Sequence, residues 1–160
     1  MSLDRFREAQ NSAFAGFDTA LDELRSGGKR SHWIWYVFPQ LDGLGSSTYA
    51  RTFALNGVAE AEEYLRDPEL RRRLLGVTTV VAEQLRKGTA VDVLMGSDID
   101  AKKLVSSLTL FRHVARSLPG RKGSDEYAAL ARAADDVLAV AAAQGYPPCA
   151  YTLGRLRSSP

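Results

Sequence analysis

The chain has 160 residues, of which 45% are hydrophobic, 25% charged and 9% aromatic, and its formal net charge is +2 at pH 7. These are ordinary values for a globular protein, so we expect one domain over residues 1–160 with enough chain to bury a sizeable core. The small net charge gives no argument for nucleic acid or an anionic membrane as a partner. The one cysteine, Cys149, excludes an intramolecular disulfide and a metal cage built from cysteines.

The start of the chain and its hydropathy indicate a cytoplasmic protein. Four charged residues stand among the first eight positions, so no apolar signal-peptide core begins there. No uninterrupted apolar run approaches the roughly 18 residues that a membrane-spanning helix needs. We therefore expect no membrane contact. Because a single free cysteine suits a reducing compartment, we also expect a cytoplasmic location.

The first predicted element is an amphipathic helix over residues 3–24. Its apolar residues recur at helical spacing; they are Leu3, Phe6, Ala13, Phe14, Phe17, Leu21 and Leu24. Gly27 and Gly28 follow and end the helix, because glycine readily takes the left-handed conformation found at helix ends.

The next segment, residues 29–40, holds both tryptophans and one of the two histidines. Its β-branched and aromatic residues favour a strand. Ser31 as an N-cap and Pro39 as a terminator instead bracket a helix of two turns. We expect the helix, because no second convincing strand follows to pair with it and a lone strand leaves its backbone hydrogen-bonding groups unsatisfied.

The rest of the chain is predicted to be helical, with short turns between the helices. Asp67-Pro68-Glu69 is a strong start signal, because a capping carboxylate precedes a proline at the first helical position. Helices are expected over residues 58–65, 68–86, 91–95, 100–117 and 124–144, followed by a short closing turn over 151–156. Other predicted N-terminal caps are Asn56, Thr89 and Asp98. The expected fold class is all-α, a compact single-domain bundle of about six helices.

Three blocks of sequence, in this order, are similar to a known family. The first block is residues 29–41 with Gly43-Leu44-Gly45. The second is Glu60-Ala61 to Tyr64-Leu65, followed by Pro68, Leu70, Arg73 and Leu74. The third is Asp100 to Lys103-Leu104, followed by residues 106–111. With these blocks the chain resembles the domain-of-unknown-function family 1810, small bacterial and fungal proteins sometimes mislabelled as calpastatin. Calpastatins are disordered inhibitors, whereas this composition is globular. The resemblance covers most of the chain and implies a compact all-α fold; it implies no established activity and carries over no catalytic residues.

The aromatic segment, residues 29–40, supplies the first candidate site. On a helix, His32 shares a face with Trp35, and Trp33 lies on another face. A tryptophan would stack on a flat ligand, and His32 would supply a titratable group for proton transfer. The alternative is that both tryptophans are core anchors and His32 is a hydrogen-bonded structural residue.

The glycine-rich turn after this segment supplies the second candidate. Gly43 and Gly45 precede several hydroxyl residues, and the backbone N–H groups of such a turn suit a phosphate, with Lys29 as a nearby cation. No strand precedes the turn, so it is not a dinucleotide-binding fingerprint. The alternative is a helix-ending turn with solvated charges.

The predicted helix that begins at Asp100 supplies the third candidate. Asp100, Lys103 and Ser107 fall near one face, and Ser106 and Thr109 fall near another. Hydroxyl residues in the middle of a helix are unfavourable by propensity, which marks either function or close helix packing. The functional interpretation is a polar patch that faces the aromatic segment across a cleft. The alternative is that small hydroxyl residues admit a neighbouring helix.

The sequence leaves two functions open. The first is a domain that binds or processes an anionic small molecule, such as a phosphate-bearing nucleotide or an ADP-ribose-like ligand. Its catalytic candidates are His32 and Asp100, and its ligand-binding candidates are Lys29, Trp33, Trp35, Gln40, Gly43, Gly45, Lys103, Ser106, Ser107 and Thr109. The second is a non-enzymatic protein-interaction domain in which the same residues form the core.

No metal and no cofactor are expected. His113 is the only other histidine, and no acid stands at ligand spacing from His32. The basic run Arg71-Arg72-Arg73 indicates a solvated helix face, since no aromatic residues are interleaved with it, so nucleic acid is not expected as a partner. The sequence indicates neither an oligomeric state nor a particular reaction.

Overall fold

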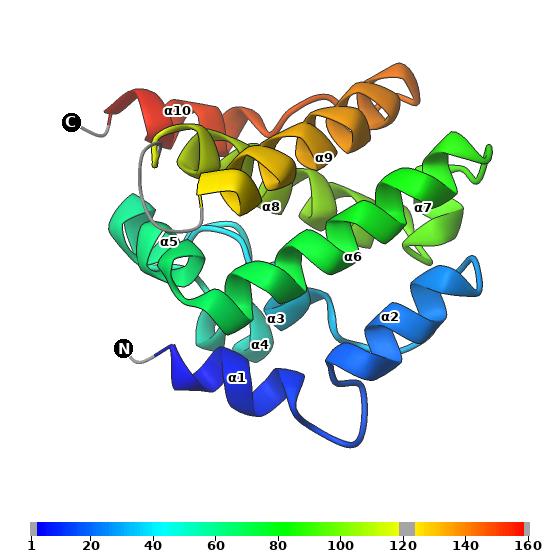
Figure 1. Ribbon diagram of the computed structural model, residues 1–160, viewed down its shortest axis with the longest axis horizontal. Coiled ribbons are helices and arrows are strands. Elements are labelled where there is room, and N and C mark those ends of the chain that lie inside the picture. The colour runs from blue at the N-terminus through cyan, green and yellow to red at the C-terminus, as the bar shows by residue number, and fades with distance from the viewer. Residues whose placement is uncertain (1–2, 119–123, 159–160) are drawn as a thin grey trace.

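The computed structural model describes residues 3–118 and 124–158. Within these ranges every regular element is a helix, so the all-α expectation is confirmed (Figure 1). The helices are α1 (Asp4–Gln10), α2 (Phe17–Arg25), α3 (Ile34–Val37), α4 (Thr48–Thr52), α5 (Gly57–Arg66), α6 (Pro68–Arg86), α7 (Val91–Leu94), α8 (Asp98–Arg116), α9 (Ser124–Ala143) and α10 (Ala150–Ser158). Ten helices in the described residues exceed the expected number of about six, because helical spacing merges some short helices and overlooks others.

The first predicted helix is in fact two. The expected continuous helix over residues 3–24 is wrong, since α1 and α2 are separated by a turn. In that turn Ala15 has a φ of 51°, in the left-handed region, and a side chain on Gly16 would collide with the Ser12 carbonyl. The turn lets α1 pack against α3 while α2 packs against α6. It also leaves Phe14, which the periodic pattern placed on the buried face, 88% exposed.

The aromatic segment forms a single helical turn, α3, so the choice of helix over strand is confirmed for residues 29–40, although the helix is shorter than expected. Ser31 as its N-cap is wrong. The N-cap position belongs to Trp33, and the Ser31 hydroxyl donates instead to Glu23 of α2. The Ser31 side chain, which the local sequence predicted to cap the helix, is therefore hydrogen-bonded to a carboxylate on another helix.

The start of α6 is as predicted, and the start of α8 is not. The Asp67 carboxylate accepts a hydrogen bond from the Leu70 N–H at 3.0 Å and caps α6. α8 begins earlier than expected, because the Ser97 hydroxyl accepts the N–H of Asp100 at 3.1 Å and Asp98 already belongs to the helix. Asp98 is therefore wrong as the cap.

Two other predicted caps also differ. Ala90, not Thr89, occupies the N-cap of α7. Asn56 does precede α5, but its side chain makes no capping hydrogen bond. The hydroxyl and amide types at these turns thus predict where helices start better than they predict which atom caps them.

α8 lies at the centre of the fold and packs against α9, α5, α10, α3 and α7 (Figure 1). α6 runs beside α9, and α2 packs against α6. The largest fully buried side chains are Trp33, Tyr64, Phe6, Phe38 and Phe111. No helix among the described residues is long and apolar enough to cross a membrane. The packing of α3 on α8 brings the first and third candidate sites together, although they are far apart in the sequence.

Candidate functional site

The loop between α2 and α3 is held by one buried carboxylate. Glu23, which is 6% exposed, accepts hydrogen bonds from the backbone N–H groups of Arg30 and Ser31 at 2.7 and 2.9 Å. It also accepts the Ser31 hydroxyl at 2.5 Å and the Trp33 indole N–H at 2.9 Å. Burial alone raises the pKa of this carboxyl group, but the hydrogen bonds outweigh it and hold the pKa of Glu23 at about 2. Glu23 therefore fixes the path of the loop that carries Lys29.

Sequence reasoning missed Glu23, although the sequence contains a signal. Glu23 lies beside Ala20 and Leu24 on the face of α2 that is buried. An acid on the apolar face of a helix is rarely buried unless it has partners. Two glycines and several backbone donors follow it within ten residues, which is the setting of a loop anchor.

The two tryptophans have different roles. Trp33 is fully buried in the core and donates to Glu23, so no face of its ring is open to a ligand. Trp35 is partly exposed and stacks on Tyr49 of α4, with ring centroids 5.1 Å apart and an angle of 22° between the rings. The ammonium of Lys103 lies 4.9 Å from the centre of the Trp35 ring, within range of a cation–π contact. Trp35 thus meets the polar residues at the start of α8.

Asp100 binds two lysines. Its carboxylate lies 2.7 Å from the ammonium of Lys29 and 3.4 Å from that of Lys103. The Lys29 side chain is only 6% exposed, and its ammonium also lies 5.1 Å from the Trp33 ring. The structure therefore brings five predicted residues into one cluster, Lys29, Trp33, Trp35, Asp100 and Lys103, in which each charge already has a partner.

His32 is not part of that cluster. It is exposed and lines an open cavity of about 580 Å³ together with Arg30, Tyr36, Tyr49 and residues of the turn between α1 and α2. No hydrogen bond or ion pair joins His32 to Asp100, both of which the structure describes. The two predicted catalytic residues thus have different neighbours: His32 lines this open cavity, and Asp100 lies in the cluster with the two lysines.

The glycines of the turn after α3 have packing reasons of their own. Gly43 has a φ of 93°, and a side chain there would collide with the ring of Tyr151 from α10. The Tyr151 hydroxyl donates to the Asp42 carbonyl at 2.8 Å, which ties α10 to the turn. Gln40 donates from its amide to the Leu44 carbonyl at 3.3 Å. A Cβ on Gly45 would come within 2.9 Å of that of Ala50. Close packing explains this turn without a ligand.

The hydroxyl residues of α8 separate into buried and lining residues. Ser107 is fully buried, and its hydroxyl has no hydrogen-bond partner among the described residues. Thr109 donates to the Val105 carbonyl at 2.7 Å and accepts the Cys149 N–H at 3.2 Å, which joins α8 to the start of α10. Ser106 donates to the Lys102 carbonyl at 3.0 Å and lines a cavity. Of the three, Ser106 alone is positioned to meet a ligand in that cavity.

That cavity has a volume of about 390 Å³ and a largely apolar wall. It lies between α8, the turn after α3 and the segment that precedes α10. Its lining residues are Leu44, Lys102, Val105, Ser106, Gly145, Tyr146, Pro147, Pro148, Cys149 and Ala150. Four side chains with polar groups line it, and these groups are the ammonium of Lys102, the hydroxyls of Ser106 and Tyr146 and the thiol of Cys149. Sequence reasoning missed the segment over residues 145–150, because nothing local shows that it folds back onto α8.

Cys149 is half-buried in this cavity. Burial raises the pKa of its thiol, but the nearby Ser106 and Thr152 hydroxyls and the backbone at the start of α10 stabilise the thiolate more, so the pKa lies below its ordinary value. Among the described residues no group of three or more His, Cys, Asp or Glu is placed to hold a metal ion. The chemistry that the cavity offers is therefore apolar contact, one cation, two hydroxyl groups and one thiol.

Comparison with known proteins places the chain in a family. A family model described as "Protein of unknown function (DUF1810)" matches residues 1–128. No curated protein matches the chain. The crystal structure of the conserved hypothetical protein Rv1873 from Mycobacterium tuberculosis is similar to this one, with a TM-score of 0.74 and 31% sequence identity over 98% of this chain and 97% of that chain. The chain therefore belongs to the DUF1810 family of proteins of unknown function.

Proposed function

We propose that this protein is a small-molecule-binding domain and that its site is the 390 Å³ cavity on α8. The observation that carries the proposal is the composition of its wall. Small-molecule sites are concave, measure roughly 300–1,000 Å³ and combine apolar walls with a few polar groups. This cavity has that size, and the polar groups of Lys102, Ser106 and Cys149 stand among apolar residues.

The wall favours a ligand with an apolar or flat body and one anionic group. Tyr146, Pro147 and Leu44 offer flat or apolar faces, and Lys102 offers a single exposed cation. A phosphate-bearing nucleotide or an ADP-ribose-like ligand fits this chemistry, with the phosphate at Lys102. The position of the cavity also supports the proposal, since residues of two of the three candidate sites, the glycine-rich turn and α8, line it.

The proposal assigns binding and no proton transfer. His32 and Asp100 do not line this cavity, and Asp100 is paired with two lysines. Cys149 is a suitable reporter of binding, because it is the one cysteine in the chain and lines the cavity.

The experiment combines thermal shift with protection of that thiol. AMP, ADP-ribose and a set of sugar phosphates are tested for a rise in Tm and for slower alkylation of Cys149 by iodoacetamide. A ligand at a hundredfold excess over its Kd adds about 2.7 kcal/mol of stability, which raises Tm by about 5–10 °C in a chain of this size. We expect both effects from the same compound.

Two pairs of variants locate the site. Ala150→Trp fills the cavity and should abolish binding, whereas Ala59→Trp places the same side chain on the exposed surface of α5 and should not. Lys102→Met should weaken binding of the anion, whereas Lys87→Met, at the exposed end of α6, should leave it unchanged. If no compound shifts Tm, or if Ala150→Trp binds as well as the wild type, the proposal fails and the interaction-domain alternative is favoured.

A further inference from the structure

Another cavity lies over the C-terminal half of α8 and shares no lining residue with the 390 Å³ cavity, which is called the first cavity below. Its volume is about 440 Å³. The lining residues are Thr109, Arg112, His113, Arg116, Leu153, Leu156 and Arg157. Those from α8 recur at helical spacing and form one face of that helix, and those from α10 form a neighbouring wall. The cavity is therefore a groove with α8 as its floor.

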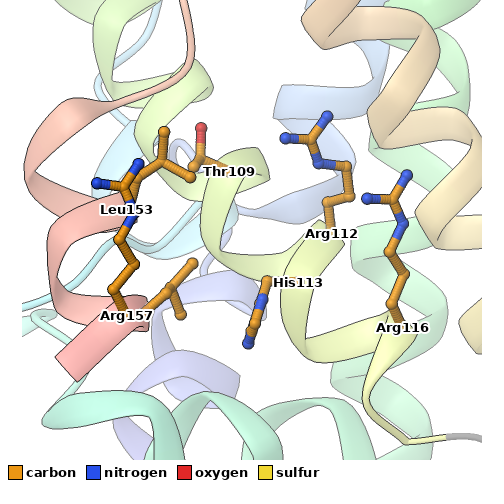
Figure 2. A pocket seen from close by; sticks show the side chains of 7 residues that line it. Thr109, Arg112, His113, Arg116, Leu153 and Arg157 are labelled. Atoms are coloured by element: carbon orange, nitrogen blue, oxygen red, sulfur yellow. The ribbon is translucent and has the colours of Figure 1, made fainter. Parts of the chain in front are cut away.

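The groove has cations on both sides. Figure 2 shows Arg157 and Leu153 rising from α10 on one side, and Arg112 and Arg116 extending from α8 on the other. His113 lies between them and adds an imidazole. A ligand that lies along the floor would therefore meet a guanidinium at each side.

One carboxylate holds two of the arginines in place. Asp135 of α9 accepts a hydrogen bond from Arg112 at 3.1 Å and two from Arg116 at 2.9 and 2.7 Å. Arg157 is exposed and makes no hydrogen bond or ion pair with any described residue. Three guanidinium charges thus stand against one carboxylate, so the groove keeps an excess of positive charge, and two of its arginines are already oriented.

We propose that this groove binds a small molecule that carries two or more phosphate groups. The planar guanidinium donates two parallel hydrogen bonds to phosphate oxygens, and it stays charged at every physiological pH. Because the cations stand on opposite sides of the groove, a ligand with two anionic groups uses both, and a single phosphate reaches one. Leu153 and Leu156 supply an apolar wall for the rest of such a ligand.

Nucleic acid fits the groove less well. Base stacking needs aromatic side chains interleaved with the cations, and no Phe, Tyr or Trp lines this groove. The net charge of the chain, +2, is also small for a surface that follows a nucleic-acid backbone. The proposal therefore commits to a small molecule, and it does not depend on the function proposed for the first cavity.

The test measures pyrophosphate binding by isothermal titration calorimetry at constant ionic strength. We expect pyrophosphate to bind more tightly than orthophosphate, and Arg157→Gln to weaken binding about tenfold, the loss of one charge-assisted contact. Arg157 is exposed and has no hydrogen-bond or ion-pair partner among the residues that the structure describes, so this variant should keep the fold. Arg132→Gln is the control, because Arg132 is exposed on α9 and lines no part of the groove. Pyrophosphate should also shift the methyl resonances of Leu153 and Leu156.

Three outcomes would overturn the proposal. They are no measurable pyrophosphate binding, equal losses in Arg157→Gln and Arg132→Gln, and tighter binding of a single-stranded oligonucleotide that also depends on Arg157. The last outcome would make the groove a nucleic-acid surface. Lys102→Met should leave pyrophosphate binding unchanged, so failure of this proposal and failure of the first cavity can be told apart.

Discussion

The Glu23 carboxylate accepts the Trp33 indole N–H at 2.9 Å, and this buried pair joins α2 to the start of α3. The same carboxylate accepts two backbone N–H groups and a hydroxyl from residues 30–31, so it organises the loop that positions Lys29 beside Asp100. Glu23, which sequence reasoning did not single out, thus helps to determine where the candidate residue Lys29 lies.

Replacement of this carboxylate should destabilise the protein strongly. Glu23→Gln puts an amide N–H₂ group where donors already converge, and it leaves buried N–H groups with weaker acceptors. We expect a loss of about 2–4 kcal/mol in the free energy of unfolding, seen as a fall in Tm on the order of 10 °C. Glu83→Gln, at an exposed position of α6, is the matched control and should change Tm little. Equal effects of the two variants would contradict the role assigned to Glu23.

The low pKa of Glu23 predicts how stability depends on pH. The group has a pKa of about 2 when folded, against 4.5 as its ordinary value, so its contribution is fully present above pH 4.5 and is lost as the pH falls towards 2. That contribution is at most about 3 kcal/mol. The carboxyl groups of Glu60 and Asp67 also have lowered pKa values and act in the same direction. The difference in stability between wild type and Glu23→Gln should therefore narrow from pH 6 to pH 2.5 in urea unfolding curves, whereas a constant difference would show that the pKa of Glu23 is the same in the folded and unfolded states.

The two tryptophans should respond differently to substitution by phenylalanine. Trp33→Phe leaves a gap in the core and removes a donor from Glu23, which should cost about 2–4 kcal/mol. Trp35→Phe keeps an aromatic ring against Tyr49 and should cost less than about 1 kcal/mol. Iodide should quench the fluorescence of the Trp33→Phe protein, which retains the exposed Trp35, more than that of the Trp35→Phe protein. The reverse order would contradict the burial described here.

The pair of Lys29 and Asp100 should behave as a structural ion pair. Asp100→Asn leaves the buried Lys29 ammonium without its carboxylate and should cost about 2–3 kcal/mol, somewhat less than for a fully buried pair. Lys29→Met added to Asp100→Asn should recover part of the loss, because it removes the unpaired charge. Asp98→Asn is the control for loss of a carboxylate in the same first turn of α8 and should cost less than about 1 kcal/mol. Additive single and double variants in chemical denaturation would rule out the coupling.

Much of the helical architecture can be predicted from the sequence, because its signals are local. Asp67-Pro68 marks the start of α6, and Gly88 follows its end. The spacing of apolar residues marks the long helices α6, α8 and α9. The signals fail where a tertiary contact competes with a local one. Ser31 has the sequence of a cap but donates to Glu23, and Ser97 caps α8 in place of Asp98.

The candidate site could be predicted only in part. Lys29, Trp35, Asp100 and Lys103 do come together, as the sequence analysis anticipated, because α3 packs against α8. The position of His32 relative to Asp100 could not be predicted from spacing, since residues far apart in the sequence have no fixed distance until the helices pack. For the same reason the sequence did not predict the cavities of about 390 and 440 Å³ on α8, each of which has a wall from α10 or the segment before it.

By itself, the sequence determined that the chain is helical and where its strongest helix starts lie, because capping residues, prolines and glycines act on backbone only a few residues away. Only the tertiary structure decided which tryptophan is buried, which charges are paired and which hydroxyl residues of α8 line a cavity. Those outcomes depend on how helices pack, and packing is fixed by the combined burial of side chains from the whole chain.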